Sequence, residues 1–428
     1  MRAIRLVLIL FLGTILTGCR SPAPGFFPLG IYAPGSTNEL QEIHSAGFNL
    51  VTGPASQAFL QAAGRHQLHV LAVIPSTPGR FFASSPVESM VRRQDSNPNL
   101  WAWYVVDEPD LNGISPMAVE QANRVVKQSG RKPTALVLYS GSDALDYAAI
   151  PDILMIDRYP VPWLPLANFS QHVRLARFAA GPQKSLITVI QAFDWNYYPE
   201  LLGVRTNLSR PGGCDALVAE RVGDASSPEA SAPTNGAPAF SRDAGGVRTF
   251  CDRASQPCVS APPSFRLRVP TYEEIRCMSY CALAEGANGL FYYAYDDGKW
   301  RMSDHPATWD ALRQVVGEVN RRLPLFTARH PWSGIYVTYP DWASGWNEAL
   351  NSAVTTVVLE AAAGNATVKK GRYVLSVNTT ARDVKFQVHL PTLPGTLAVF
   401  EENRNVMVNA GVLSDGIGPY AVHVYGPF

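Results

Sequence analysis

Eight short apolar runs follow one another between residues 26 and 296, and segments with helix signals separate most of them. Ser36-x-x-Glu39 and Thr271-x-x-Glu274 read as capping boxes, and Ser115-Pro116 is typical of a helix start. A strand–helix alternation repeated eight times predicts an α/β fold, the (β/α)₈ or TIM barrel. The expected strands cover residues 27–32, 48–51, 68–74, 100–106, 133–139, 153–157, 186–190 and 289–295.

The alternative for such a pattern is an open, doubly wound sheet. That fold commonly has a Gly-rich phosphate-binding loop after its first strand. The corresponding stretch here is Gly30-Ile-Tyr-Ala-Pro-Gly-Ser36, which is not such a loop. We therefore expect a barrel over residues 26–325.

The second half of the chain changes pattern. Residues 306–323 predict the last barrel helix, and short alternating strands separated by Gly, Pro and Asn turns follow Pro331. They predict a small antiparallel β-sandwich over 326–428. Residues 203–265 are rich in Gly, Ser, Ala and Pro and are too long for an ordinary loop. They form either an irregular insertion or a substrate-covering loop held by cysteines.

The N-terminus has the pattern of a targeting segment. Arg2 and Arg5 precede an apolar run over 6–16 that ends in Leu16-Thr-Gly-Cys19. This stretch resembles bacterial lipoprotein signals, in which cleavage precedes an acylated cysteine. The resemblance implies a signal peptide over 1–18, lipidation of Cys19, a tether over 19–25 and a membrane-anchored protein of the cell envelope, at the outer membrane or cell surface. The alternative is an ordinary secretory signal.

Composition restricts the classes of partner. The formal charge is +1, from 36 basic and 35 acidic residues, so no basic excess indicates nucleic acid. No CxxC pair or His-rich cluster indicates a metal, and we expect no cofactor. Cys214, Cys251 and Cys258 are candidates for disulfides, whereas Cys277 and Cys281 are expected to pack as small apolar residues. The oligomeric state is left open.

The stretch Trp101-Ala-Trp-Tyr-Val-Val-Asp-Glu-Pro-Asp110 reads as a buried strand that ends in two carboxylates. Burying acids is costly unless they are paired or used, and barrel enzymes place their sites at the C-terminal strand ends. We take Glu108 as the leading catalytic candidate, with Asp107 beside it.

The other strand ends combine acids with aromatic residues. Such a set suits a sugar, because aromatic rings cover the apolar faces of pyranoses while carboxylates bind hydroxyls and perform acid–base chemistry. No Lys, Cys or Ser–His arrangement for imine or acyl chemistry accompanies them. The candidates are Tyr32, Tyr139, Asp157, Tyr159, Gln191, Asp194, Trp195, Tyr295, Asp297 and Trp300.

Val106-Asp-Glu-Pro109 resembles the Asn-Glu-Pro motif of (β/α)₈ retaining glycosidases. The stretch over 270–293 resembles the last helix–strand unit of such barrels, and 402–404 with 420–425 resemble the closing strands of their C-terminal sandwich. The resemblance implies that Glu108 is the general acid/base. Two positions depart from it: Asp107 replaces the asparagine, and Gln191 stands where that family has its nucleophile.

Four explanations of Gln191 stay open. In the first, Asp194 supplies the nucleophile of a retaining enzyme, which requires its carboxyl group to lie about 5–5.5 Å from that of Glu108. In the second, the enzyme inverts, and Asp157 or Asp297 acts as the base about 6.5–9.5 Å from Glu108. Alternatively, the Asp107–Glu108 pair resembles the acids of substrate-assisted hexosaminidases, with Tyr159 holding the acetamido group. The fourth explanation is a barrel that binds sugar without cutting it.

Each candidate also has a structural interpretation, in which it supports the fold and does not contact a substrate. In this interpretation Asp107 would pair with Arg158, Asp157 would cap a loop, and Asp297 would lie in a turn before Gly298. Trp195 and Trp300 pack under the insertion, and His305 starts a helix. Our leading hypothesis is hydrolysis of an O-glycosidic bond of an envelope or environmental glycan, and the second is a non-catalytic carbohydrate-binding lipoprotein.

Overall fold

A computed structural model describes residues 26–32, 36–75, 82, 84–199, 241–242, 248–249, 266–331, 333–340 and 353–428. The predicted signal peptide, lipidation at Cys19 and tether lie outside these residues. So do most of the predicted insertion and, with it, Cys214, Cys251 and Cys258.

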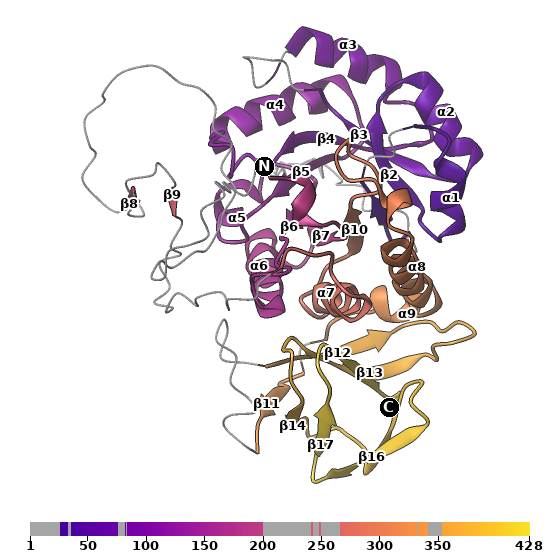
Figure 1. The fold of residues 1–428 in the computed structure, drawn as a ribbon, viewed down its shortest axis with the longest axis vertical. Helices are drawn as coiled ribbons and strands as arrows, with labels where there is room; N and C mark the ends of the chain where they lie inside the picture. The colour runs from indigo at the N-terminus through magenta and orange to yellow at the C-terminus, as the bar shows by residue number, and fades with distance from the viewer. Residues whose placement is uncertain are drawn as a thin grey trace, which may run out of the picture.

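Eight parallel strands close into a barrel in the order β1-β10-β7-β6-β5-β4-β3-β2 (Figure 1). The predicted TIM barrel is confirmed, and each strand lies within a few residues of its predicted range. The strands are β1 Leu29–Ile31, β2 Leu50–Pro54, β3 His69–Val73, β4 Leu100–Asp107, β5 Thr134–Leu138, β6 Ile153–Asp157, β7 Ser185–Gln191 and β10 Gly289–Tyr293. Two short strands, β8 Ser241–Arg242 and β9 Arg248–Thr249, pair with each other apart from the barrel.

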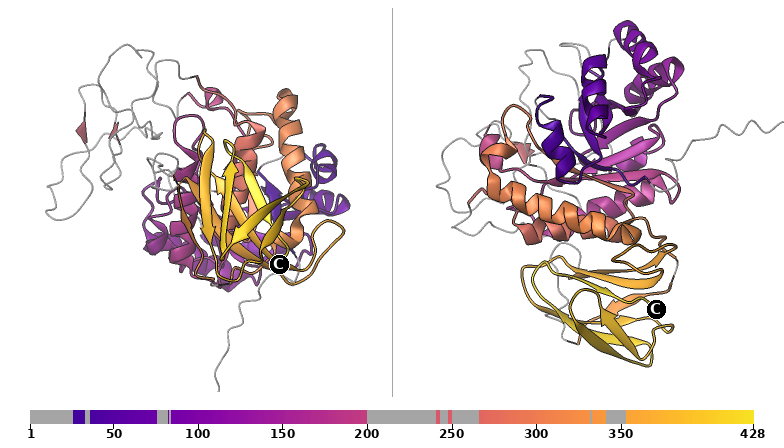
Figure 2. Two further views of the ribbon diagram at one scale, coloured as in Figure 1. Left: turned by 90° about the horizontal axis from the view of Figure 1, so that it is seen from below. Right: turned by 90° about the vertical axis from the view of Figure 1, so that its right-hand side faces the viewer.

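Helices cover the outside of the barrel (Figure 2). They are α1 Leu40–Ser45, α2 Gln57–Arg65, α3 Ser84–Gln94, α4 Pro116–Ser129, α5 Ala144–Tyr147, α6 Leu166–Ala180, α7 Tyr272–Ala284, α8 Pro306–Arg321 and α9 Leu323–Phe326. None of the helices in the described ranges is long and apolar enough to cross a membrane.

The predicted helix starts have different outcomes. The capping box of Thr271 and Glu274 is confirmed, and Ser115 caps α4 by accepting a hydrogen bond from the Ala118 N–H. The predicted box at Ser36 and Glu39 is wrong, because Ser36 bonds the Glu39 carboxylate while α1 begins only at Leu40.

Helix α7 is buried along most of its length because it has neighbours on both sides. It contacts β7 of the barrel and also β12 and β13 of the C-terminal domain. Cys277 and Cys281 are fully buried free thiols on this helix, which confirms their predicted packing role. The Cys277 thiol donates to the Asn378 carbonyl oxygen at 3.4 Å, so it also contacts the second domain.

The C-terminal domain is an antiparallel β-structure with its own core, as predicted. Phe386, Val374, Leu413 and Tyr425 are fully buried within it. Its strands, in the order β11-β14-β17-β16-β15-β18-β13-β12, are β11 Tyr336–Thr338, β12 Val354–Ala361, β13 Gly371–Asn378, β14 Val384–His389, β15 Thr396–Val399, β16 Arg404–Asn409, β17 Val412–Ile417 and β18 Val422–Tyr425.

A buried charge cluster joins the two domains. The Glu318 carboxylate on α8 accepts hydrogen bonds from Arg276, at 2.9 Å, and from the Tyr280 hydroxyl, at 2.7 Å. Arg322 lies 2.7 Å from Glu318 and also bonds Glu401 of the C-terminal domain. Burial alone would raise the pKa of Glu318, but the hydrogen bonds and charges of the two arginines hold it below its ordinary value. The carboxylate therefore stays ionised and paired.

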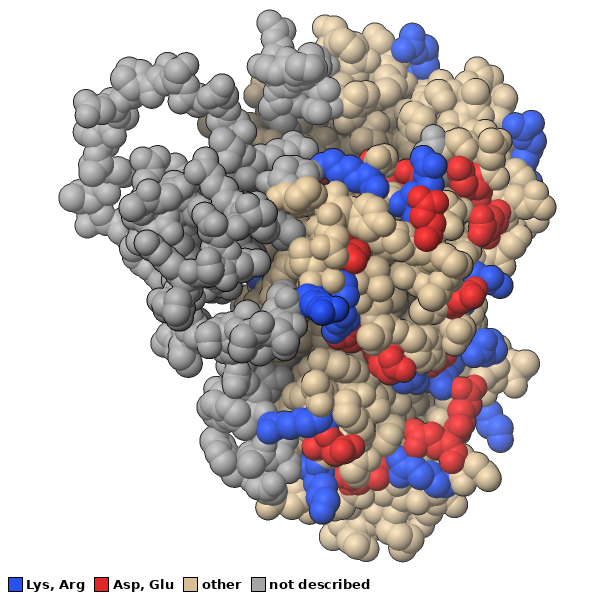
Figure 3. Space-filling model, viewed as in Figure 1, with Lys and Arg blue, Asp and Glu red and all other residues tan. Residues whose placement is uncertain are grey.

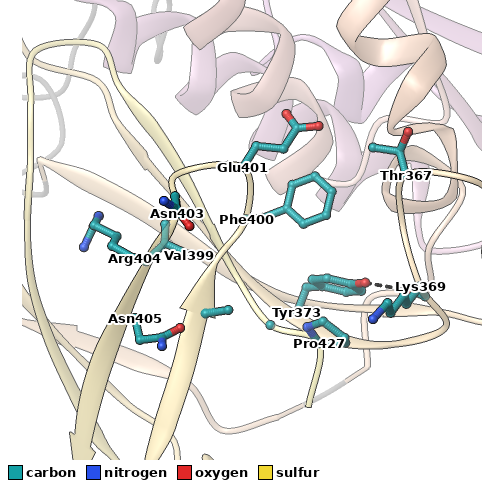
Figure 4. A pocket seen from close by; sticks show the side chains of 12 residues that line it. Thr367, Lys369, Tyr373, Val399, Phe400, Glu401, Asn403, Arg404, Asn405 and Pro427 are labelled. Carbon is teal, nitrogen blue, oxygen red and sulfur yellow. Dashed lines mark hydrogen bonds between the residues drawn. The ribbon is translucent and has the colours of Figure 1, made fainter.

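Two cavities lie away from the mouth of the barrel. One, of about 410 Å³, is in the C-terminal domain with Phe400 and Tyr373 on its wall (Figure 4). The other, of about 350 Å³, adjoins the cluster around Glu318. Basic and acidic side chains intermingle over the face shown in Figure 3.

We predict that Glu318→Ala destabilises the protein by about 3–5 kcal/mol, because it removes the buried carboxylate that Arg276 and Arg322 share and leaves half-buried Arg276 without its anion. Urea unfolding measures the effect. Glu120→Ala is the matched control, because its pair with Arg124 is exposed on α4, and its loss is expected to cost under about 1 kcal/mol. Equal effects of the two changes would contradict the importance of the cluster.

Candidate active site

Two consecutive acids reach the barrel mouth because the end of β4 is irregular. Regular alternation would place Tyr104 and Asp107 on opposite faces, yet the Tyr104 hydroxyl donates to the Asp107 carboxylate. A register shift against β5 between Tyr104 and Val106 explains their meeting. Glu108 then adopts φ +41°, a left-handed conformation that costs a residue with a side chain about 1–3 kcal/mol.

Hydrogen bonds hold Glu108 in this strained conformation. Its N–H donates to the Val137 carbonyl oxygen at 3.0 Å. Its own carbonyl oxygen accepts from both the backbone and side-chain nitrogens of Asn112, each at 2.9 Å. The backbone of this one residue is thus fixed by β5 and by the loop that follows β4.

The carboxyl groups of Glu108 and of Asp157, at the end of β6, lie close enough for each to shift the pKa of the other. Burial is the largest cause that raises the pKa of Glu108, and the negative charges of Asp157 and Asp107 add to it. Burial likewise raises the pKa of Asp157, against hydrogen bonds from Glu108 and the Tyr159 hydroxyl. Both pKa values are raised by burial and by neighbouring negative charge, so the pair retains a proton at neutral pH.

This contact bears on the predicted role of Asp157. An inverting base lies about 6.5–9.5 Å from the acid, with a water between the two groups. Asp157 is instead buried, with only 4% of its surface exposed, and in contact with Glu108. The structure therefore gives Asp157 the geometry of a proton-sharing partner and not that of an inverting base.

Asp107 is the exposed carboxylate of the group. Behind it, the Tyr104 hydroxyl accepts from the Tyr32 hydroxyl at 3.3 Å. Burial, followed by the charge of Asp107, raises the pKa of both tyrosines, so they remain hydrogen-bond donors. The two buried tyrosines thus orient the Asp107 carboxylate. Tyr32 is buried and affects Asp107 only through its hydrogen bond to Tyr104.

Asp110 is a site residue that our sequence reasoning did not identify. Its carboxylate accepts from the backbone N–H groups of Tyr139, at 3.2 Å, and Ser140, at 2.8 Å. Burial raises its pKa to about 6, against those hydrogen bonds. It joins the loop after β4 to the end of β5. The only sequence signal for it was its position directly after Pro109.

Aromatic side chains from several strand ends form a wall beside Asp157. Tyr159 packs edge-on against Phe193, with ring centres 5.1 Å apart, and Phe193 lies 4.9 Å from Trp195. Trp163 lies 5.3 Å from Trp195 and is half-buried, as Tyr159 is. The predicted candidates Tyr159 and Trp195 are thus brought together, and Trp163 and Phe193 join them.

Asp297 fixes this wall from the end of β10. Its carboxylate accepts hydrogen bonds from the hydroxyls of Tyr198, at 2.7 Å, and Tyr293, at 2.6 Å, and from the backbone N–H of Trp300, at 2.9 Å. It is half-buried in the turn that precedes Gly298. These bonds match the turn interpretation and make Asp297 a support for the aromatic residues.

Gln191 lies at the end of β7 and has no exposed surface. Its side-chain nitrogen donates to the Val161 carbonyl oxygen at 2.7 Å, and its side-chain oxygen accepts from the Val161 N–H at 2.9 Å. The predicted substrate contact is therefore corrected: both ends of this amide bind the loop after β6. A carboxylate at this position could not make the donated bond.

Two aromatic candidates also point away from the mouth. Tyr295 is buried, and its hydroxyl donates to Glu42 at 2.8 Å, outside the strand ends. Trp300 is fully buried, donates to the Ala294 carbonyl oxygen at 3.1 Å and stacks on His305. Both predicted substrate contacts are wrong, because these rings pack beneath the turn after β10. His305 itself is the N-cap of α8, as predicted.

Asp194 caps the 3₁₀ turn Trp195–Tyr197 by accepting from the Asn196 N–H at 2.9 Å. The acids with the largest effects on the pKa of Glu108 are Asp157, Asp107 and Asp110. The structure therefore supplies a local structural role for Asp194. Within the described ranges, no group of three His, Cys, Asp or Glu side chains could hold a metal ion.

Comparison with protein-family models and with curated proteins gives no match. Among solved structures, a catalytic mutant of Gan42B, a GH42 β-galactosidase from G. stearothermophilus, is similar with a TM-score of 0.50 and 9% identity, covering 93% of this chain and 98% of that chain. An Anoxybacillus α-amylase covers 91% of this chain and 88% of its own, with a TM-score of 0.49 and 9% identity. The likeness to the β-galactosidase shows that the two chains share a fold, and it shows nothing beyond the fold.

We predict that Asp157→Asn stabilises the protein near pH 8 by about 1–2 kcal/mol. The folded pair has raised pKa values, so the folded state binds more protons than the unfolded state and wild-type stability falls as pH rises above about 4. The gain should therefore disappear near pH 4, where both states are protonated. Urea unfolding across this range measures it. A destabilisation that is the same at every pH would contradict the shared proton.

Proposed function

We propose that this protein is a glycoside hydrolase in which Glu108 donates a proton to the glycosidic oxygen. The observation that carries the proposal is the closeness of the half-buried Glu108 carboxyl group to the buried carboxyl group of Asp157. A general acid must hold its proton at the working pH, and a buried, negatively charged neighbour favours the protonated form. As the bond to the leaving sugar breaks, the proton of Glu108 passes to its oxygen.

Asp107 is the second carboxylate in this proposal. It is exposed, and Tyr104 orients it. It would activate either a water molecule or the acetamido group of the substrate itself, and neither route needs an acid at position 191. The anomeric configuration of the product distinguishes the two routes, because the substrate-assisted route retains the configuration of the substrate.

The aromatic wall supports a carbohydrate as the ligand. Tyr159 and Trp163 keep part of their surface exposed next to the paired acids. Aromatic rings in such positions cover the apolar face of a sugar while carboxylates bind its hydroxyls. Orienting the sugar in this way would hold the glycosidic oxygen near Glu108.

A non-catalytic carbohydrate-binding protein is the second candidate. The observation that favours it is Gln191, which stands where the resembling glycosidases have their nucleophile and which bonds the backbone of Val161 at both ends. In that case the barrel is a degenerate glycosidase that binds sugar without cleaving it.

We also propose that lipid on Cys19 anchors the mature chain in the cell envelope, at the outer membrane or cell surface. The support is the sequence Leu16-Thr-Gly-Cys19 after an apolar run. Cys19→Ser should abolish incorporation of labelled palmitate and release the protein from membranes. Unchanged labelling in this variant would refute the anchor.

We predict that Glu108→Gln lowers turnover on a panel of envelope and plant glycans by about 10²–10⁴-fold. Wild-type activity should fall as pH rises through the raised pKa of the carboxyl pair, because the acid loses its proton. Glu120→Gln, exposed on α4, is the control and should leave turnover unchanged.

Retained activity in Glu108→Gln would refute the assigned acid. Binding of a glycan by both proteins without hydrolysis by either would instead support the carbohydrate-binding candidate.

A further inference from the structure

Arg158 occupies a fixed position on the loop directly after Asp157. Its Nε donates to the Asn168 side-chain oxygen at 2.7 Å, and its guanidinium carbon lies 4.6 Å from the centre of the Tyr139 ring. Asn168 belongs to the first turn of α6, and Tyr139 follows β5. The half-buried guanidinium is therefore held from two sides before any ligand arrives.

The terminal nitrogens of this group have no acceptor. Within the described ranges, Arg158 makes no ion pair, and only its Nε donates a hydrogen bond. Arg177, by contrast, uses both terminal nitrogens on carbonyl oxygens and on Asn288. Arg276 places its fork on Glu318. The unpaired fork of Arg158 is unusual here because several acids lie at the same barrel mouth.

Tyr139 connects this arginine to the proposed acid. The guanidinium of Arg158 lies over the Tyr139 ring in a cation–π contact. Burial is the main cause that raises the pKa of the Tyr139 hydroxyl, and the charges of Arg158 and Glu108 also affect that pKa. Arg158 and Glu108 thus both lie near the same aromatic side chain. That closeness suits two groups that contact the same sugar residue or adjacent ones.

We infer that Arg158 binds a carboxylate on the substrate, so that the glycan cleaved at Glu108 contains acidic sugars. A guanidinium fork matches a carboxylate with two parallel hydrogen bonds, and fixing Nε in advance reduces the ordering cost of binding. The inference rests on the proposed function for its site. It adds the class of substrate: a polymer or oligomer containing uronic acids or similarly acidic sugars.

Most of the acids near Arg158 are protonated or compensated, and Asp107 is the exposed carboxylate among them. The Glu108–Asp157 pair retains a proton, and hydrogen bonds from backbone N–H groups of Tyr139 and Ser140 compensate Asp110. Arg158 is therefore a cation available to an incoming carboxylate.

The test compares acidic and neutral oligosaccharides on the full chain. Calorimetry on the Glu108→Gln protein would measure binding of galacturonate and glucuronate oligomers and of the matching galactose and glucose oligomers. We expect the acidic oligomers to bind at least about tenfold more tightly at low salt, and Arg158→Gln to remove that preference. Arg158→Lys should restore only part of it, because an ammonium lacks the planar fork.

Arg124→Gln, which removes an exposed arginine from α4, is the matched control and should leave the preference unchanged. Circular dichroism and thermal unfolding establish that each variant is folded. Equal affinity for acidic and neutral oligomers, no binding of any oligomer, or a preference that survives Arg158→Gln would overturn the inference.

The inference and the proposed function fail in different ways. Glu108-dependent hydrolysis of neutral glycans without any acidic preference would overturn the inference and leave the function standing. An acidic preference that depends on Arg158, without hydrolysis by the wild type, would overturn the function and support the inference.

Discussion

The closeness of half-buried Glu108 to buried Asp157 is the constraint on which the candidate site depends. Two neighbouring carboxyl groups that are both removed from water are costly to ionise together, so the pair retains a proton. The protein supports this unfavourable arrangement with ordinary backbone bonds. Val137 and Asn112 hold Glu108 in its left-handed conformation. A strained residue thus lies next to a buried acid, as is common where chemistry occurs.

The aromatic residues and the second domain extend that support outward. Asp297 holds Tyr198 and Tyr293, which in turn pack against Phe193 beside Tyr159. The C-terminal domain packs against α7 and supplies Glu401 to the cluster around Glu318. Because α7 contacts β7, packing of the second domain also fixes a barrel strand that ends at the candidate site.

The sequence predicted the barrel and Glu108 because both depend on local patterns. Strand–helix alternation and an acid pair before Pro109 are visible without any tertiary contact. Gln191 could not be interpreted in this way, since its partner, Val161, lies 30 residues away and bonds it through the backbone. Tyr295 and Trp300 followed a strand end as expected, but the turn after β10 directs both rings toward α1 and α8.

The most direct measurement is a titration of ¹³C-labelled aspartate and glutamate carboxyl groups by NMR. We predict that one glutamate and one aspartate titrate together, with a proton still bound near neutral pH. In Glu108→Gln the glutamate signal should disappear and the aspartate signal should shift. A protein in which every carboxyl group is ionised well below neutral pH would contradict the shared proton and, with it, the assignment of Glu108 as the acid.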